Sequence, residues 1–499
     1  MLALAGALTV LIATRHGPYV SPDAVSYIGT ARGLAAGDGF TAPPGTPPVG
    51  HFPPLFPATL AALDVVGLDP VDGARWLNAL LLAATVLVAG LVLRRATARW
   101  WPGFIGGVLV VGATDILAYH SSALSDPLFA LLSLIGLVAL ALYLETRRPL
   151  FLGAAASVTA LALLTRYVGV ALVVTGAVAL VVCGAGRRRR GIADATLFAT
   201  ALAPGAAWVL WARSSQPGGS EGDVVFHSFD ASYLERGAGN VIDWIVPQSV
   251  PWWLGAAALA AVVALTVWLL RAPSPRAPAT PVPVRGRFPA LCGLFAGAYL
   301  VVILADRLLL DASALLDKRF LLPLHLVAIL GVLAWVGVRP IRGFVKTVAI
   351  GAVTVLVLLQ LGEAATWVRE SVDDGGVRGG GYTSRLWRDS PVIAAVGHLP
   401  PGVPVYTNGP DAIWFLTGRT TKMLPVERDY LTGRSNPDYG TQIAEMGARM
   451  RAASGLVVYF PMIKSRRSLP TVADLRRVMP LRQLSSDPVG AIYEPGSAP

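Results

Sequence analysis

Charged side chains are scarce in this chain of 499 residues, and their scarcity excludes most classes of protein. Only 14% of the residues are Asp, Glu, Lys or Arg, against about 25% in an ordinary soluble domain. Apolar residues make up 54% of the chain, and the mean hydropathy is +0.59. These values exclude a soluble enzyme, a disordered chain and a fibrous protein. They indicate a protein that crosses the membrane several times.

Cysteines and nucleotide-binding motifs are also scarce. Cys183 and Cys292 are the two cysteines, and each lies inside an apolar run, so we expect both to be unpaired and to form no CxxC metal site. The C-terminal part contains no GxGxxG, P-loop or GxSxG motif, and nothing there indicates a nucleotide site. The net charge of the chain is +11. In a membrane protein such an excess of basic residues usually lies on the cytoplasmic loops, so we expect no nucleic-acid partner.

Apolar runs long enough for membrane helices recur along the chain, since about 20 apolar residues cross the hydrocarbon core. We expect eleven spans, near residues 1–14, 74–93, 101–119, 127–144, 150–164, 168–184, 192–211, 252–270, 289–305, 319–338 and 343–361. The first run is short and has no basic region before it, so we expect a transmembrane helix rather than a signal peptide. Residues 151–183 are too long for one crossing, and the polar break Thr165-Arg166-Tyr167 predicts two helices joined by a tight turn.

Basic and acidic residues alternate between successive loops. The basic loops lie near residues 94–99, 147–148, 187–190, 271–287 and 339–346, whereas the intervening loops carry mainly Asp and Glu. Basic loops of membrane proteins face the cytoplasm, so we predict that the acidic loops face outward. Eleven spans that start from a cytoplasmic N-terminus place everything after residue 362 outside the cytoplasm.

The region 385–499 has a different composition and predicts a small extracytoplasmic α/β domain, joined by a linker, 362–384, to a membrane part, 1–361. Its strand-like runs are 403–406, 456–460 and 491–493, and its helix-like runs are 391–398, 411–417, 438–451 and 472–478. Their alternation is typical of an α/β layer. The predicted fold class is therefore a polytopic α-helical membrane protein with a small C-terminal α/β domain.

Two acids stand out in the predicted outer loops. Asp23 follows Ser21-Pro22 in the loop 15–73, at the start of a predicted helix that ends at Gly37. Asp126 begins another predicted helix, in the sequence HSSALSDPLFALL. The alternative interpretation of both acids is helix capping, since acids are favoured in a first turn. Ionisable residues at membrane depth also suggest a functional site, and both interpretations stay open at this point.

Three basic residues lie on the same predicted side. Arg166 interrupts two apolar runs, and an interfacial Arg needs an anionic partner such as Asp23, Asp126 or a phosphate. Lys318 and Arg319 lie on the outward side, where basic residues are unfavoured. The alternatives are snorkelling of Arg166 to the interface, and a salt bridge of the Lys-Arg pair to Asp311 or Asp317.

Polar residues near these loops add further candidates. Tyr27 lies one helical turn after Asp23, and His51 and His120 lie near the two acids. We expect these three residues to contact substrate. The two histidines and the acids are also potential ligands of a divalent metal, although no HxxxH or HxE spacing supports a metal site. A carboxylate deprotonates a hydroxyl and a cation stabilises a phosphate, so this set suits the transfer of a group from a lipid phosphate.

Several segments together resemble the GT-C class of membrane glycosyltransferases, in particular its protein mannosyltransferase and aminoarabinose transferase branch. These segments are PDAVSYIGTARGLAAGDGF, HFPPLFPATLAAL, SDPLFALL, LLTRYVGVALV, DKRFLLPL and PPGVPVYTNGPDAIWFLTGRTTKMLP. The resemblance covers most of the chain, and the order and common placement of the segments carry it. This sequence departs from better-defined branches in having a single Asp after the first span and a small C-terminal domain.

The resemblance implies a donor and a role for each residue. The donor is a polyprenyl-phosphate sugar, Asp23 is the catalytic base, and Asp126 is the second catalytic acid. Arg166, Lys318 and Arg319 bind the donor phosphate. We therefore predict an integral glycosyltransferase of the cytoplasmic membrane that acts on a glycan, lipid or protein acceptor at its outer face. The alternatives are a flippase or transporter of a lipid-linked sugar and a non-catalytic scaffold of a cell-wall synthesis complex.

Overall fold

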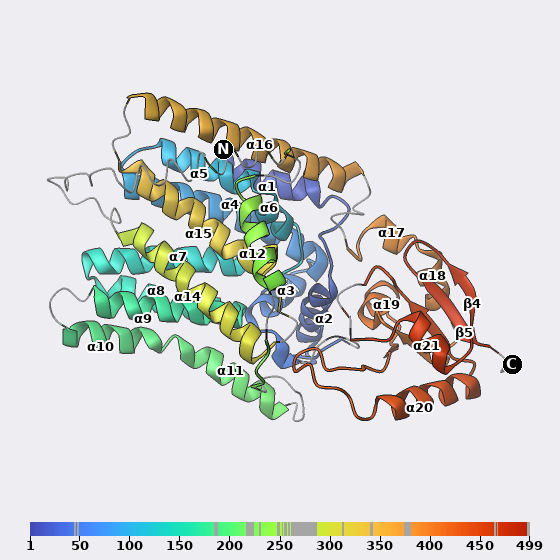
Figure 1. Cartoon of the computed structure of the whole chain (residues 1–499). Helices are drawn as coiled ribbons and strands as arrows, with labels where there is room; N and C mark the ends of the chain where they lie inside the picture. Colours follow the sequence, from blue (N-terminus) through green and yellow to red (C-terminus); the bar gives the residue numbers. More distant parts are fainter. Residues whose placement is uncertain are drawn as a thin grey trace.

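The computed structural model of the chain shows a bundle of helices with a small mixed sheet at one end (Figure 1). It describes residues 1–43, 46, 49–183, 188–215, 224–228, 231–246, 250, 251, 253, 257, 260, 287–311, 314–339, 343–373, 381–463, 466 and 468–496.

The bundle is built from α-helices and two short 3₁₀ helices. They are α1 (Leu2–Ala13), α2 (Pro22–Ala36), η1 (Val49–His51), α3 (Leu55–Val65), α4 (Pro70–Thr97), α5 (Trp101–Gly112), α6 (Thr114–His120), α7 (Asp126–Thr146), α8 (Pro149–Thr165), η2 (Tyr167–Gly169), α9 (Val170–Val182), α10 (Arg188–Ala199), α11 (Leu202–Ser215), α12 (Ala231–Asp243), α14 (Arg287–Leu309), α15 (Lys318–Gly337) and α16 (Gly343–Asp373).

Six helical segments of the described chain are long and apolar enough to cross a membrane, and the bent pair α5–α6 makes a seventh. The six are α4, α7, the α10–α11 segment, α14, α15 and most of α16. The helices α1, α8 and α9 coincide with expected spans, but with 12, 17 and 13 residues they are shorter than the six helical segments above. The expected span 252–270 lies almost wholly outside the described residues. A polytopic membrane protein is therefore confirmed, whereas the number of eleven spans stays a prediction.

Local sequence explains where the helices begin and end. Ser21 caps α2 by accepting a hydrogen bond from the amide of Ala24 at 3.4 Å, and Pro22 occupies the first turn. Gly37 ends this helix at φ +89, a left-handed conformation that glycine adopts without strain. Residues 165–169 break the long apolar run into α8 and α9, as predicted, because Arg166 adopts extended backbone.

The C-terminal part contains a five-stranded sheet of order β2-β1-β3-β5-β4. The strands are β1 (Val405–Thr407), β2 (Lys422–Met423), β3 (Leu456–Tyr459), β4 (Leu481–Ser486) and β5 (Ala491–Pro495), and the helices are α17 (Arg385–Arg388), α18 (Pro391–Gly397), α19 (Pro410–Thr417), α20 (Tyr439–Ala452) and α21 (Val472–Val478). Strand β1 pairs in parallel with β2 and β3, whereas β5 is antiparallel to β3 and β4.

Some boundaries differ from the sequence prediction. The helix α16 continues to Asp373, so it occupies part of the expected linker 362–384. Strands β2 and β4 were not predicted from the sequence. The first has two residues, and the second is an almost fully exposed strand at the edge of the sheet. Neither has the buried apolar run or the alternation by which strands are recognised.

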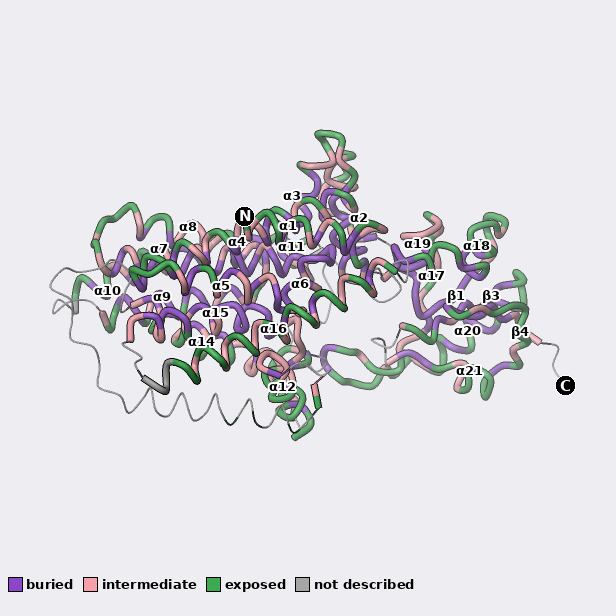
Figure 2. Tube along the Cα trace, turned by 90° about the horizontal axis from the view of Figure 1, so that it is seen from above, coloured by how far each residue is buried: buried purple, intermediate pink, exposed green. Residues whose placement is uncertain are grey.

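Three apolar cores organise the described chain, and Figure 2 shows buried residues both along the bundle and in the sheet. One of them lies within the C-terminal part, between the sheet and the helices α20 and α21. The largest core lies among the membrane helices. The second core joins the two parts, because it contains residues of α2 and α3 together with residues of α18, α19, β1 and β3. The sheet is thus fixed to the same end of the bundle that carries α2.

The backbone of residues 19–20 connects three distant loops at this junction. The amide of Tyr19 donates to the carbonyl of Ser121 at 2.9 Å, and the amide of Tyr382 donates to the carbonyl of Val20 at 2.9 Å. Gly381 lies so close that a Cβ atom there would come within 2.3 Å of the Val20 carbonyl oxygen. The loop between α1 and α2, the loop before Asp126 and the C-terminal part therefore meet at one place.

Candidate active site

Asp23 lies in the first turn of α2, and its carboxylate is not the cap of that helix. Ser21 is the N-cap residue, so the carboxylate of Asp23 is available for a partner from elsewhere. That partner is Arg319 in the first turn of α15, whose Nη1 lies 2.5 Å from Oδ2 of Asp23. The side chain of Asp23 is 33% exposed.

Asp126 is the first residue of α7, and it is almost completely buried. The N-cap Ser125 makes no side-chain cap bond, and the Asp126 side chain is 3% exposed. Its Oδ1 accepts a hydrogen bond from Nη1 of Arg166, and its Oδ2 accepts one from Nε of Arg319 at 3.1 Å. The capping interpretation of this acid is therefore not supported, since both carboxylate oxygens bind guanidinium groups.

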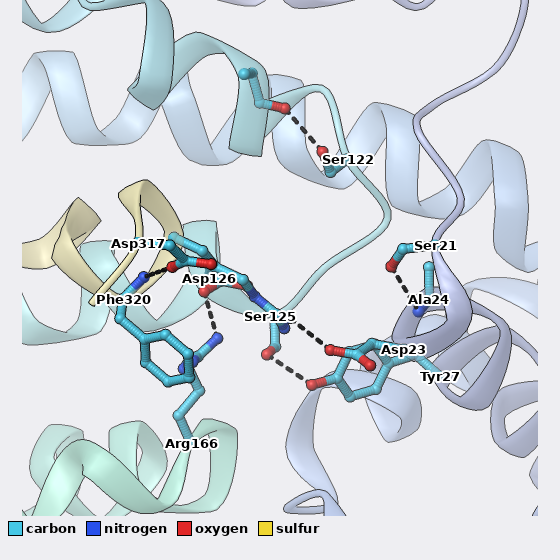
Figure 3. Close-up of polar contacts among 12 residues, drawn as sticks. Ser21, Asp23, Ala24, Tyr27, Ser122, Ser125, Asp126, Arg166, Asp317 and Phe320 are labelled. Atoms are coloured by element: carbon cyan, nitrogen blue, oxygen red, sulfur yellow. Dashed lines mark hydrogen bonds and ion pairs between the residues drawn. The ribbon is translucent and has the colours of Figure 1, made fainter. Parts of the chain in front are cut away.

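These four residues form one group, which we call the Asp–Arg cluster: Asp23, Asp126, Arg166 and Arg319. They come from α2, α7, the α8–α9 turn and α15, and Arg319 bridges acids that lie 296 and 193 residues away in sequence. Figure 3 shows Arg166 directed at Asp126 and the ring of Phe320 beside it. The guanidinium of Arg166 lies 5.6 Å from the centre of that ring, a favourable cation–π distance.

The cluster determines the charge state of Asp23. Burial raises the pKa of this carboxyl, but the charge of Arg319 and its hydrogen bond outweigh burial and leave the pKa below the usual 3.8. The charges of His51 and Arg166 lower it further. Asp23 is therefore ionised at neutral pH, and its negative charge faces the guanidinium of Arg319.

Tyr27 and His51 lie next to the cluster. The Tyr27 hydroxyl lies 3.0 Å from Oγ of Ser125 (Figure 3), and burial raises the pKa of Tyr27 to about 12, so the hydroxyl stays protonated. Its ring packs on Phe52 and Phe56, with centroids 4.7 and 5.1 Å away. His51 packs edge-on against Phe52 at 4.6 Å. These two predicted substrate contacts are thus near Asp23.

His120 and Lys318 are placed differently. His120 is 1% exposed, and its Nδ1 bonds the carbonyl of Ile116 at 2.7 Å, so it belongs to the packed interior. Lys318 is next to Arg319 in sequence, but its Nζ lies 2.9 Å from Oδ2 of Asp243 in α12. The salt bridge that we considered for the Lys-Arg pair involved Asp311 or Asp317. Instead, Asp317 caps α15 by accepting from the amide of Phe320 at 3.0 Å.

Sequence reasoning missed a second ionisable pair. Nδ1 of His325 in α15 lies 2.8 Å from a carboxylate oxygen of Asp115 in α6, and the Trp244 ring stacks on the imidazole at 4.5 Å. Both members of this pair lie in predicted spans, where an ionisable residue is itself a signal. The presence of Asp115 and His325 within apolar runs could therefore have identified this pair from the sequence.

Metal ligation can be tested on the same residues. The part of the chain that the structure describes holds no group of three His, Cys, Asp or Glu side chains arranged for a metal ion. The two acids of the cluster contact arginines instead, and a divalent cation there would have to displace positive charges. The residues present therefore fit an anion better than a metal.

Comparison with known proteins gives one decisive result. Neither a protein-family model nor a curated protein matches the chain. Among solved structures, ArnT from Cupriavidus metallidurans, crystallised bound to undecaprenyl phosphate, matches with a TM-score of 0.61 over 99% of this chain and 97% of that chain, at 14% sequence identity. The chain has the GT-C fold.

Two further structures accompany this match. The apo form of the same ArnT has a TM-score of 0.60 at 14% identity, over 97% of this chain and 95% of that chain. The arabinosyltransferase EmbB from Mycobacterium smegmatis has a TM-score of 0.37 at 15% identity, over 79% of this chain and 42% of that chain. The EmbB similarity is too low to support an argument. The ArnT match agrees with the class that the sequence segments resemble, and it extends over the C-terminal part.

Proposed function

We propose that this GT-C protein is an integral membrane glycosyltransferase that moves a sugar from a polyprenyl-phosphate carrier to an acceptor hydroxyl. The observation that carries the proposal is the Asp–Arg cluster, in which Arg319 holds both acids at the junction with the C-terminal part. The ArnT structure with the same fold is bound to undecaprenyl phosphate, which supports a carrier of that chemistry. The sugar is a hexose or a pentose, and the acceptor is a glycan, a lipid or a protein.

Asp23 is the proposed base. It is the more exposed of the two acids, at 33% against 3% for Asp126, so an acceptor hydroxyl has access to it. In the proposed step the acceptor oxygen bonds to the anomeric carbon while the bond from that carbon to the phosphate oxygen breaks. The hydroxyl proton goes to Asp23, and the electron pair leaves on the polyprenyl phosphate.

The arginines complete the charge balance of this step. The lipid phosphate gains one negative charge as it leaves, and Asp23 loses one as it takes the proton. Arg319 is thereby released from Asp23 at the moment when the phosphate needs a cation. Arg166 stays beside Asp126, and its planar fork suits a phosphate. In this proposal Asp126 holds both guanidinium groups in place.

The outer face of the cytoplasmic membrane is the proposed location of the site. The alternation of basic and acidic loops supports this assignment, and the proposal includes the placement of residues 385–499 outside the cytoplasm. A fusion of alkaline phosphatase to the C-terminus should be active, and a fluorescent-protein fusion there should be dark. The reverse pattern would show that the orientation is wrong.

The proposal is tested with purified protein in lipid nanodiscs. A panel of synthetic polyprenyl-phosphate sugars, each with candidate acceptors, should yield a transferred sugar and free polyprenyl phosphate in equal amounts. Omission of divalent cations, with a chelator present, should leave transfer intact. If no donor reacts and undecaprenyl phosphate does not bind, a scaffold or transport function is favoured instead.

A further inference from the structure

The helix α12 contacts the start of α15 and the residues just before it. It runs across the bundle (Figure 1), and Gly237 brings its backbone directly onto Leu316, where an added Cβ would lie 2.1 Å from Leu316 Cδ2. One turn later, Nδ2 of Asn240 donates to the carbonyl of Leu316 at 2.9 Å. The glycine and the asparagine thus fix α12 to the residue just before α15.

The end of α12 holds the first two turns of α15. Asp243 pairs with Lys318 at 2.9 Å, and the adjoining Trp244 stacks on His325 with ring centroids 4.5 Å apart and planes 7° apart. His325 is itself held by Asp115 of α6. The contacts of this segment therefore reach residues between Leu316 and His325, which lie on both sides of Arg319 in the sequence.

The first turn of α15 needs external support because of its own sequence. Pro323 lies inside the helix, and a proline has no amide hydrogen to donate to the carbonyl four residues earlier. In α15 that carbonyl belongs to Arg319. The helix is therefore weakened where the arginine that bridges Asp23 and Asp126 is attached, and α12 contacts α15 on both sides of the weak point.

We propose that α12, through Gly237, Asn240, Asp243 and Trp244, is a brace that positions Arg319 for the donor phosphate. These four are positioning residues, because they act through Arg319. The proposal rests on the proposed function in one respect, namely that Arg319 meets a phosphate. The stabilisation of the start of α15 by α12 does not depend on that function, and it can be measured without any donor.

The first experiment measures hydrogen exchange in peptides that cover Leu316–Pro323, with the full-length protein in nanodiscs. Asp243→Asn and Trp244→Ala should each speed exchange there, whereas Asp243→Glu should not. Glu235→Gln removes an exposed charge from the same helix and is the matched control. Unchanged exchange in both Asp243→Asn and Trp244→Ala overturns the brace, whatever the protein binds.

The second experiment measures binding of undecaprenyl phosphate to the same variants. Asp243→Asn should weaken binding by up to about fivefold, the size of effect expected for a partly exposed ion pair, and Glu235→Gln should leave it unchanged. Faster exchange with unchanged binding overturns the positioning role. If the wild-type protein does not bind this lipid, the proposed function fails, and the exchange measurement still decides on the brace.

A disulfide provides the rescue. A Cβ at Gly237 would lie 3.4 Å from the Cβ of Leu316, close to the usual Cβ separation of about 3.5–4.5 Å in disulfides. The double variant Gly237→Cys and Leu316→Cys, placed in the Asp243→Asn background, should recover slow exchange and lipid binding when oxidised and lose both when reduced. Equal behaviour in the two redox states contradicts the brace.

Discussion

Two buried carboxylate groups in this protein use the same residue types in different ways. In the C-terminal part, Asp411 is 0% exposed, accepts from the Tyr382 hydroxyl at 2.9 Å and pairs with Arg466 at 2.6 Å. Arg466 also donates to the backbone carbonyl of Asn408 at 2.7 Å. The partners of Asp411 thus belong to the packed interior around α19.

The Asp–Arg cluster is arranged otherwise. Each of its contacts joins two segments that are distant in the sequence, Arg319 is shared by two acids, and Asp23 is one-third exposed. A carboxylate that is enclosed on all sides stabilises a fold, whereas one that shares its cation and faces solvent is able to exchange that cation for a ligand. The comparison therefore assigns a structural role to Asp411 and supports a chemical role for Asp23.

The largest expected effect is on transfer in Asp23→Asn. The amide has nearly the shape of the carboxylate but cannot take a proton, so the transfer rate should fall by about 10²-fold or more, the usual contribution of a general base. The variant should still fold and bind undecaprenyl phosphate. Near-normal transfer would remove Asp23 from the mechanism. Asp126→Asn, measured alongside, shows whether the second acid shares the work.

Asp411→Ala should affect stability instead of chemistry. Removing this acid leaves Arg466 without its buried counter-charge, and breaking a buried pair in this way costs about 3–5 kcal/mol. Limited proteolysis and the melting transition should report a destabilised C-terminal part. If Asp411→Ala keeps its melting transition but loses transfer, the structural role assigned to Asp411 is wrong, because the two acids would then have similar roles.

Arg166 gives a smaller effect that separates charge from geometry. Arg166→Lys keeps the positive charge and loses the planar fork, so the dissociation constant for undecaprenyl phosphate should rise modestly. Arg166→Ala should raise it by roughly tenfold or more, as expected for hydrogen bonds to charged groups. If both variants bind the lipid normally but melt at lower temperature, Arg166 is structural, as Arg466 is.

The smallest effect concerns pH. The pKa of Asp23 lies below 3.8, and a lowered carboxyl pKa contributes stability that is present above the unfolded-state value and lost as pH falls through the folded-state value. Between pH 5 and 8, therefore, titration of Asp23 should change neither the transfer rate nor the melting midpoint. A step in this range that disappears in Asp23→Asn would contradict the low pKa.

The sequence alone determined the local elements of this protein. The apolar runs gave the positions of the described membrane helices, the residues Thr165-Arg166-Tyr167 gave the break between α8 and α9, and Ser21, Pro22 and Gly37 gave the limits of α2. These features depend on hydrophobic periodicity and capping within a few residues, so they can be read without knowledge of the rest of the chain.

Only the tertiary structure decided which charged residues meet. Lys318 and Arg319 are neighbours in sequence, yet one pairs with Asp243 and the other with Asp23 and Asp126. Successive side chains on a helix point about 100° apart, because one turn contains 3.6 residues, so each faces a different part of the bundle. Which acid lies there depends on the packing of α2, α7 and α12 around α15, and no local pattern in the sequence specifies that packing.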